Sequence, residues 1–392
     1  MAPLNLDPAA ALPADGTSGT LVGRVWRPDV DGPAVAAVRA DGLYDISRAF
    51  PTMRDLCEAT EPAAAAAAAA GEKIGALAGV LANTPEAGRD PTKPWLLAPI
   101  DLQAIKAAGV TFAISLLERV IEEQARGAPD KAAAVRAEVE AALGGAIEGL
   151  KPGSSQAADL KRLLQAKNLW SQYLEVGIGP DAEIFTKAPA MAAVGTGAEI
   201  GILAQSTWNN PEPEVVVVVN AAGAIVGATL GNDVNLRDLE GRSALLLGKS
   251  KDNNASTAIG PFIRLFDRTF SLDDVRRAEV RLTVEGSDGF RLEGTSAMAR
   301  ISRDPADLVG QMIGPHHQYP DGAVLFLGTM FAPVQDRGAP GQGFTHQAGD
   351  VVTIASQRLG ALVNVVTTCD RAPPWRFGTA ALMRNLARRG LL

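Results

Sequence analysis

The stretch NPEPEVVVVVNAAGAIVGATLGND, residues 210–233, carries the pattern that decides the fold. Its five consecutive valines are β-branched and favour a strand. The run Asn-Ala-Ala-Gly that follows is typical of a turn, and a second apolar run then leads to Gly-Asn-Asp. The sequence therefore predicts a β-hairpin with acidic residues at its open end.

The carboxylates of this hairpin are predicted to gather on one face. A turn centred on residues 221–222 places Glu214 opposite Thr229. Glu212 and Glu214 are two residues apart and share a face, and Asp233 lies diagonal to Glu212 on the same face. Three like charges so placed repel one another, and a divalent cation bound by oxygen ligands, Mg²⁺ or alternatively Mn²⁺, relieves this repulsion. A solvated acidic patch at the end of a strand is the competing interpretation.

Composition narrows the class of protein. The chain has 392 residues, 47% of them hydrophobic and 21% charged, which suits a globular protein with a sizeable core. Its net charge of −7 argues against nucleic-acid binding, so we expect a small-molecule partner. The two cysteines predict no disulfide framework. The amino terminus lacks a signal-peptide pattern and no apolar run is long enough for a membrane helix, so we expect a cytoplasmic protein without a membrane partner.

The pattern along the chain predicts two parts. Residues 1–95 contain short strand-like runs and a short helix, and we expect them to form a small N-terminal α/β accessory domain that ends at the proline-rich segment 91–99. Residues 96–392 are expected to form the catalytic domain. Helices are predicted first in this part, at 130–143 and 159–170, and strands from about residue 175 to 366. Without a regular alternation of strands and helices, the fold class is α+β.

Further polar residues are candidates for chemistry. Lys251 lies in a polar loop and Lys187 ends a short apolar run, but on residue pattern alone a solvated surface lysine is the simpler interpretation of both. Thr329 follows glycine after a predicted buried strand, where an ordinary turn is equally frequent. His346 lies in a glycine-rich loop, and loops often carry binding residues. The spacing shows no triad of nucleophile, base and orienting acid.

Together these motifs resemble the metal signature of the fumarylacetoacetate hydrolase superfamily. The resemblance covers residue 99 to the end and includes Glu-Pro-Glu at 212–214, Gly-Asn-Asp at 231–233, and Gly-Thr at 328–329. It implies a mixed β-roll around a divalent metal, usually in a homodimer or higher homo-oligomer that acts on 2-oxo acids. It also implies a role for each matching residue: metal ligation by Glu212, Glu214 and Asp233, catalysis by Lys251, and substrate contact by Thr329 and, through a Phe-x-Lys motif, by Lys187.

One departure from the family pattern affects the expected reaction. Hydrolases of the family often carry a water-activating histidine three residues before a glutamate, and here Ser115 precedes Glu118 at these positions. The chain looks closer to the branch that dehydrates 2-keto-3-deoxy sugar acids. That resemblance implies conversion of 2-keto-3-deoxy-D-xylonate (a pentonate) to 2,5-dioxopentanoate in non-phosphorylative pentose catabolism. Hydrolysis of a C–C bond in 2,4-diketo-3-deoxy acids or acylpyruvates is the alternative.

A mechanism follows as a hypothesis from this resemblance. Glu118 serves as the acid/base group, either directly or through a water held by Ser115, and Thr329 orients the substrate carboxylate. Lys251 contributes positive charge beside the carbonyl that becomes an enolate. His346 and Lys251 are rival candidates for the base.

Overall fold

The fold was determined as a computed structural model that describes residues 4–143, 145, 147, 149–166, 170–331, 333–337 and 343–392. The helices are α1 Pro8–Ala11, α2 Met53–Cys57, α3 Pro62–Ala68, α4 Leu77–Ala82, α5 Ala113–Gln124, α6 Pro129–Leu143, α7 Ser155–Ala166, α8 Gln172–Ile178, α9 Arg237–Glu240, α10 Leu247–Lys251, α11 Leu272–Arg276, α12 Pro305–Met312 and α13 Thr379–Arg388. The strands are β1 Leu21–Arg27, β2 Gly32–Arg39, β3 Gly42–Asp45, β4 Glu72–Gly75, β5 Trp95–Leu97, β6 Ala104–Ala108, β7 Ile184–Ala188, β8 Glu199–Ile202, β9 Asn209–Asn210, β10 Pro213–Val219, β11 Ile225–Asp233, β12 Asn235–Leu236, β13 Thr257–Leu265, β14 Glu279–Glu285, β15 Arg291–Ala297, β16 Ala323–Phe326, β17 Val351–Ser356 and β18 Gly360–Thr368.

The α+β class predicted from the sequence is confirmed. Helices α6 and α7 lie where helices were expected, although residues 167–169 of the second expected helix fall outside the described residues. Strands follow from β7 to β18 with few helices between them. In the described part of the chain they form one large mixed sheet, a five-stranded sheet and a two-stranded ribbon.

The hairpin of β10 and β11 is present, but its predicted register is wrong by two residues. Glu214 pairs with Gly231 rather than Thr229, and the Asp233 N–H donates to the Glu212 carbonyl at 3.0 Å. A bulge after Val218 and a longer turn cause this difference. Because the shift is even, the side chains keep their face, and Asp233 comes to lie directly across from Glu212.

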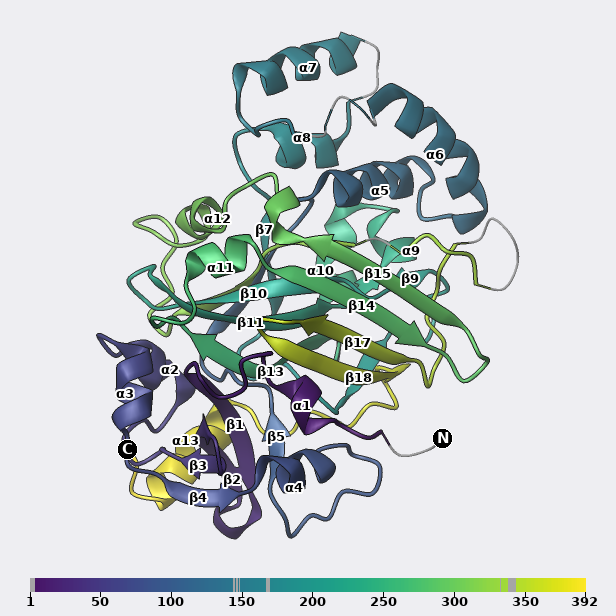
Figure 1. The fold of residues 1–392 in the computed structure, drawn as a ribbon. Helices are drawn as coiled ribbons and strands as arrows, with labels where there is room; N and C mark the ends of the chain where they lie inside the picture. The colour runs from purple at the N-terminus through teal and green to yellow at the C-terminus, as the bar shows by residue number, and fades with distance from the viewer. Residues whose placement is uncertain are drawn as a thin grey trace.

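The large sheet runs in the order β4-β3-β2-β1-β13-β11-β10-β16-β6-β7. Its β10–β11 hairpin is therefore central, between β13 and β16, and the five valines of β10 are completely buried. The smaller sheet, β15-β14-β17-β18-β8, packs over the hairpin (Figure 1). Val215, Val217 and Val219 enter the apolar core shared with this sheet, and Val216 and Val218 enter the core on the opposite face.

The first 95 residues contribute β1–β4 to the same large sheet, through antiparallel pairing of β1 with β13. The carboxy-terminal helix α13 lies beside this part (Figure 1). Asn385 on α13 donates from Nδ2 to the carbonyls of Val30 and Asp31 at 2.9 and 2.8 Å. The domain boundary near residue 95 stays a prediction of the sequence.

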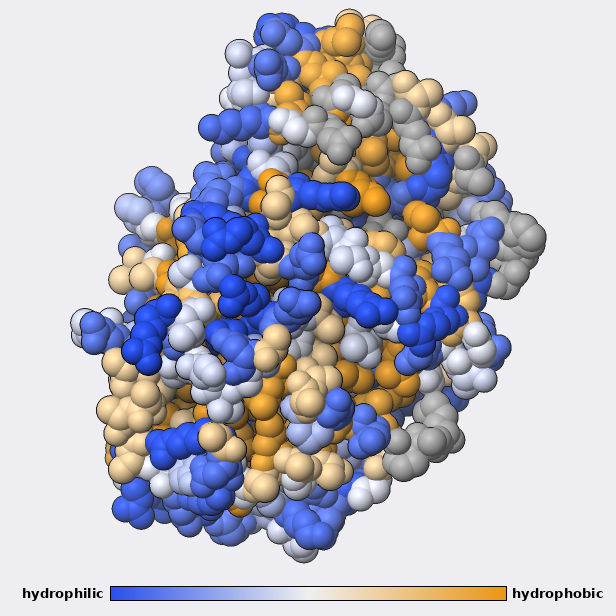
Figure 2. All heavy atoms as spheres, in the orientation of Figure 1, coloured by the Kyte–Doolittle hydropathy of each residue, from blue (hydrophilic) through white to orange (hydrophobic). Residues whose placement is uncertain are grey.

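A helical segment, residues 113–178 with α5–α8, projects from one end of the molecule (Figure 1). Its apolar side chains form a separate core cluster that includes Leu116, Val120 and Leu174. Figure 2 shows hydrophobic residues among hydrophilic ones over this segment, and Ile114 and Leu163 are about half exposed. Within the described ranges, none of the helices combines the length and the apolar composition needed to cross a bilayer.

Candidate metal and substrate site

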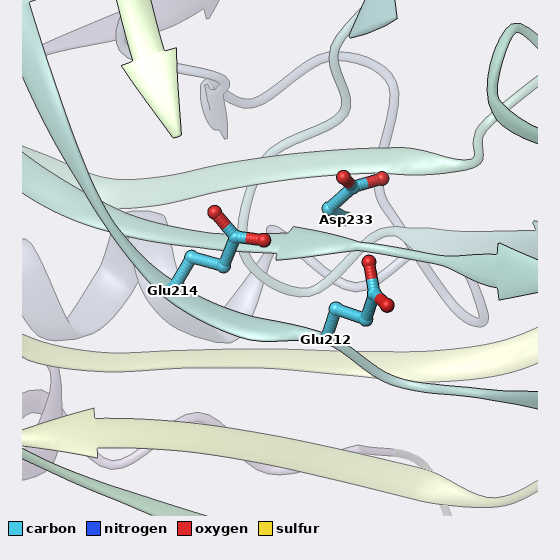
Figure 3. A group of neighbouring side chains, drawn as sticks. All are labelled: Glu212, Glu214 and Asp233. Atoms are coloured by element: carbon cyan, nitrogen blue, oxygen red, sulfur yellow. The ribbon is translucent and has the colours of Figure 1, made fainter. Parts of the chain in front are cut away.

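The hairpin brings the three predicted carboxylates together. Each of Glu212, Glu214 and Asp233 offers an oxygen within 4.8 Å of the other two, and Figure 3 shows the three side chains converging: Glu214 from β10, Glu212 from the position just before this strand, and Asp233 from β11. Their relative exposures are 4%, 1% and 2%. The alternative of a solvated acidic patch is therefore wrong, because these carboxylates are buried. Beside them, Gly231 leaves room for Phe326 and Val216, since a Cβ at this position would lie 2.3 Å from Phe326 Cε1.

Two lysines lie against these carboxylates, and the simpler interpretation of both as surface residues is wrong. Lys251 at the end of α10 places Nζ 2.7 Å from Glu212 Oε2 and 3.2 Å from Asp233 Oδ1. Lys187 on β7 places Nζ 3.2 Å from the same Asp233 oxygen and donates to the Lys251 carbonyl at 2.6 Å. Both lysines are at most 2% exposed.

The surroundings shift the pKa values of the three carboxyl groups in different directions. Burial, and then the charges of Asp233 and Glu212, raise the pKa of Glu214 well above its ordinary value. Burial also raises the pKa of Glu212. For Asp233, burial is outweighed by Lys251 and Lys187, so its pKa is lowered. The same pairing raises the pKa of Lys251 against the effect of burial, which keeps this ammonium group charged.

These residues fit a divalent cation. Glu214 forms no ion pair with any described residue, and it accepts a hydrogen bond from the Gly328 N–H at 2.7 Å. Asp233 Oδ1 accepts no well-oriented hydrogen bond from a described residue, although two ammonium groups lie nearby. Burying a carboxylate without a paired cation, or a carboxylate oxygen without a hydrogen-bond donor, costs free energy. A hard cation that prefers carboxylate oxygens would remove both costs, at Glu214 and at Asp233.

A buried arginine that the sequence reasoning missed extends the charge network. Arg119 on α5 places Nη2 2.6 Å from Glu212 Oε1, and its Nη1 lies 2.6 and 2.7 Å from Glu122 and Glu240. Lys251 lies 3.7 Å from Glu240. The helical segment is thereby tied to the carboxylates of the hairpin. Arg119 and Glu122 are three residues apart on a helix, a spacing at which opposite charges pair. This spacing was the signal in the sequence that could have identified Arg119 as part of a charge network.

The carboxylates open onto a cavity formed by strands and helices together. Its lining includes two further predicted residues, Ser115 and Thr329, and three residues that were not predicted, Glu183, Tyr173 and Glu240. Ser115 Oγ donates to the Phe112 carbonyl at 2.8 Å. Thr329 Oγ1 donates to the Phe331 carbonyl at 2.9 Å.

The other two predicted site residues lie elsewhere. Glu118 is not part of the cavity lining. It forms a two-pronged hydrogen bond with Arg136 on α6 and lies 3.5 Å from Arg237. His346 is also absent from the lining; its Nδ1 lies 3.2 Å from Asp350, and burial lowers its pKa. Residues 338–342 of the glycine-rich loop before His346 fall outside the described residues.

Glu183 is a further carboxyl group of the cavity lining. Burial, and then the charge of Glu240, raise its pKa to about 7. Its side chain lies over Gly109, where a Cβ would come within 1.9 Å of Glu183 Oε2. Side chains alternate along an extended chain, so Glu183 shares a face with Phe185 and Lys187. This alternation was the signal that could have identified it.

Comparison with known proteins places the chain in one family. The family description "Fumarylacetoacetate (FAA) hydrolase C-terminal" matches residues 153–367, more than half of the chain. The protein therefore belongs to the fumarylacetoacetate hydrolase family, as its signature residues indicated.

Two curated relatives and one solved structure are similar to this chain. A "Probable 2-keto-3-deoxyxylonate dehydratase" of Haloferax volcanii is 32% identical over 196 residues, which cover 50% of this chain and 64% of the relative. A "2-dehydro-3-deoxy-D-arabinonate dehydratase" of Saccharolobus solfataricus is 33% identical over 187 residues, which cover 47% and 58%. The chain thus spans about three fifths of the length of these relatives. The structure "2-keto-3-deoxy-D-arabinonate dehydratase complexed with magnesium and 2,5-dioxopentanoate" has a TM-score of 0.60 at 20% identity, covers 89% of this chain and 99% of the other, and shares its fold.

Proposed function

We propose that this protein is a metal-dependent dehydratase that converts 2-keto-3-deoxy-D-xylonate, a 2-keto-3-deoxypentonate, to 2,5-dioxopentanoate. The observation that carries the proposal is the buried set of Glu212, Glu214 and Asp233 beside Lys251, in a cavity with serine at the family's histidine position. Both curated relatives are named as dehydratases of 2-keto-3-deoxypentonates. The solved structure with the same fold is named as a complex with magnesium and 2,5-dioxopentanoate.

The three carboxylates would hold the metal, Mg²⁺ or alternatively Mn²⁺. A bound Mg²⁺ supplies a Lewis acid that polarises the C2 carbonyl of a 2-oxo acid and makes the C3 protons more acidic. Three carboxylates would supply only part of the ligands of a hard cation and would leave positions for substrate oxygens. Lys251 keeps its positive charge beside Glu212 and favours a negative charge that develops on the substrate oxygen.

The substrate carboxylate is assigned to the turn after β16. Thr329 lines the cavity, and its hydroxyl is oriented by the Phe331 carbonyl. The neighbouring Gly328 N–H is occupied by Glu214, so Thr329 is the group of this turn left for the substrate carboxylate, and its hydroxyl must turn from the Phe331 carbonyl to donate to it. Lys187 is completely buried behind Asp233. We assign to it the positioning of Asp233 in place of direct substrate contact.

We assign the acid/base role to Glu183 and not to Glu118. A general acid/base works best when its pKa lies near the operating pH, and burial raises the pKa of Glu183 to about 7 within the cavity. Glu118 is engaged by Arg136 and Arg237 outside the cavity. Elimination removes one C3 proton and the C4 hydroxyl, which leaves as water. The resulting enone has a C3=C4 double bond; loss of a C5 proton and protonation at C3 convert it to a C4=C5 enol. Transfer of the enol hydroxyl proton to C4 through solvent then leaves the C5 aldehyde.

The test offers the purified protein two substrates with Mg²⁺ present. With 2-keto-3-deoxypentonate we expect formation of 2,5-dioxopentanoate, and with an acylpyruvate we expect no release of pyruvate. EDTA should abolish turnover and added Mg²⁺ should restore it. Release of pyruvate without dehydration would favour the C–C hydrolase, whose reaction Ser115 does not support because serine is not a general base at neutral pH.

Variants separate the roles of the acidic residues. Glu212→Ala should abolish both Mg²⁺ binding, measured by titration calorimetry, and turnover. Glu183→Gln should keep Mg²⁺ binding and lower kcat by about a hundredfold or more. Glu118→Gln is the matched control for this carboxyl-to-amide change. If Glu118→Gln lost turnover while Glu183→Gln kept it, the two assignments would be reversed.

Three expectations from the sequence remain proposals. We propose that the protein acts as a homodimer or higher homo-oligomer in the cytoplasm, and that residues 1–95 form an accessory domain. Size-exclusion chromatography with light scattering measures the assembly.

A further inference from the structure

Tyr173 is a cavity residue to which the proposed reaction assigns no role so far. It lies in the first turn of α8, and the Ser171 hydroxyl accepts a hydrogen bond from its N–H at 3.1 Å. The side chain is 6% exposed and lines the same cavity as the three carboxylates. The cap and the surrounding core fix where this ring enters the cavity.

The hydroxyl group of Tyr173 forms only one long hydrogen bond with the described residues. It donates to the Glu240 carbonyl at 3.5 Å, at the outer limit of a hydrogen bond. No other described group bonds to it. Buried tyrosine hydroxyls usually have a good partner, so this group is available to a ligand that enters the cavity.

The neighbouring groups define what kind of ligand atom suits this position. Burial and then the charge of Glu240 raise the pKa of Tyr173, so the phenol stays neutral and can both donate and accept. Arg119, the cation nearest in the lining, is already occupied by Glu122, Glu212 and Glu240. A neutral hydroxyl group of the ligand therefore suits Tyr173 better than a carboxylate does.

Resting on the proposed function, we propose that Tyr173 binds the C5 hydroxyl of the sugar acid and makes the site select hydroxylated 2-oxo acids. The carboxylates of β10 and β11 and Thr329 define the end that receives C1 and C2. Tyr173 comes from α8, a different element, and lines the same cavity together with Ser115 and Val110. The enclosed space is about 20 Å³, so the lining must open to admit a five-carbon chain; held at C1 and C2, such a chain would bring its C5 hydroxyl to Tyr173.

A binding cycle tests this inference without depending on turnover. The ligands are 5-hydroxy-2-oxopentanoate and 2-oxopentanoate, which differ only in the C5 hydroxyl and lack the C4 hydroxyl that dehydration removes. Their affinities for the Mg²⁺-loaded wild type and Tyr173→Phe are measured by titration calorimetry. The hydroxylated ligand can close to a ring in solution, which lowers its apparent affinity for both proteins by the same factor. This factor cancels when the affinity ratio of the two ligands is compared between wild type and variant. Tyr44→Phe is the matched control, since its hydroxyl bonds to exposed Asp41.

The affinity for the hydroxylated ligand relative to 2-oxopentanoate should be about five- to tenfold greater in the wild type and Tyr44→Phe than in Tyr173→Phe, the ratio expected for one hydrogen bond. Tyr173→Phe should keep an unchanged melting temperature. The same relative affinity in the wild type and in Tyr173→Phe, or a wild type that binds neither ligand, would overturn the inference. Absence of turnover on 2-keto-3-deoxypentonate, with the expected binding pattern intact, would instead overturn the proposed reaction alone.

Discussion

The raised pKa of Glu183 leads to a prediction about stability that is independent of catalysis. In the metal-free protein, burial and the charge of Glu240 raise this pKa from 4.5 to about 7. A carboxyl group whose pKa is higher in the folded state than in the unfolded state favours folding least when it is ionised. The contribution of Glu183 to the free energy of unfolding is zero below pH 4.5, its pKa in the unfolded chain. It becomes progressively destabilising between pH 4.5 and about 7 and then levels off.

The size of the effect follows from the same two values. A shift from 4.5 to about 7 corresponds to about 3 kcal/mol when Glu183 is fully ionised. Between pH 5 and pH 8 the cost grows by about 2.5 kcal/mol. Glu183→Gln removes this titration and keeps the shape of the side chain. We therefore expect the variant to gain about 2.5 kcal/mol in the free energy of unfolding, relative to wild type, over this pH range.

Urea unfolding in EDTA at pH 5 and pH 8 measures this gain, followed by fluorescence and circular dichroism so that coincident transitions verify two-state behaviour. Glu118→Gln is the control. It loses charge-assisted bonds to Arg136 and an ion pair with Arg237, so it should be destabilised at both pH values. If the free energy of unfolding of Glu183→Gln differed from wild type equally at pH 5 and pH 8, the raised pKa of this half-buried carboxyl group would be refuted.

Three other predictions test the surrounding structure. Gly231→Ala should lower the free energy of unfolding by roughly 1–3 kcal/mol, because its Cβ would lie 2.3 Å from Phe326 Cε1; wild-type stability in urea would contradict the packing of the hairpin. Asp15→Ala should cost roughly 2 kcal/mol, since it removes both carboxylate contacts, at 2.9 and 2.6 Å, from buried Arg264; Asp159→Ala, which breaks an exposed pair with Arg162, should cost less than about 0.5 kcal/mol, and equal effects would refute the distinction. His346→Gln should change kcat/KM by less than about threefold while lowering the melting temperature, because His346 packs against Phe344 and Asp350 outside the cavity; a large loss of kcat/KM at unchanged stability would place it in the site.

The central part of the site could be predicted because it depends on local pattern. The strand between Glu212 and Val219 alternates its side chains with period two, so both glutamates had to share a face whatever the rest of the chain did. Asp233 joined them even though the predicted register was wrong. A shift of two residues preserves the face of every side chain, and it moved Asp233 from a diagonal position to one directly opposite Glu212.

The acid/base group could not be chosen in the same way. In the sequence, Glu118 and Glu183 are both acidic residues near apolar runs. Alternation places Glu183 on the face of Lys187, but no local pattern shows which of the two carboxylates ends beside Arg136 and which ends in the cavity. The choice depends on how α6 packs against α5, and on the absence of a side chain at Gly109, which leaves room for Glu183.

The sequence by itself determined the hairpin and the common face of Glu212, Glu214 and Asp233, because backbone geometry sets the alternation of side chains over a few residues. Only the tertiary structure decided that Lys251, Arg119 and the other charged groups would be buried around them. Those groups come from elements that are distant in the sequence, and their charge state depends on which neighbours packing brings within a few ångströms.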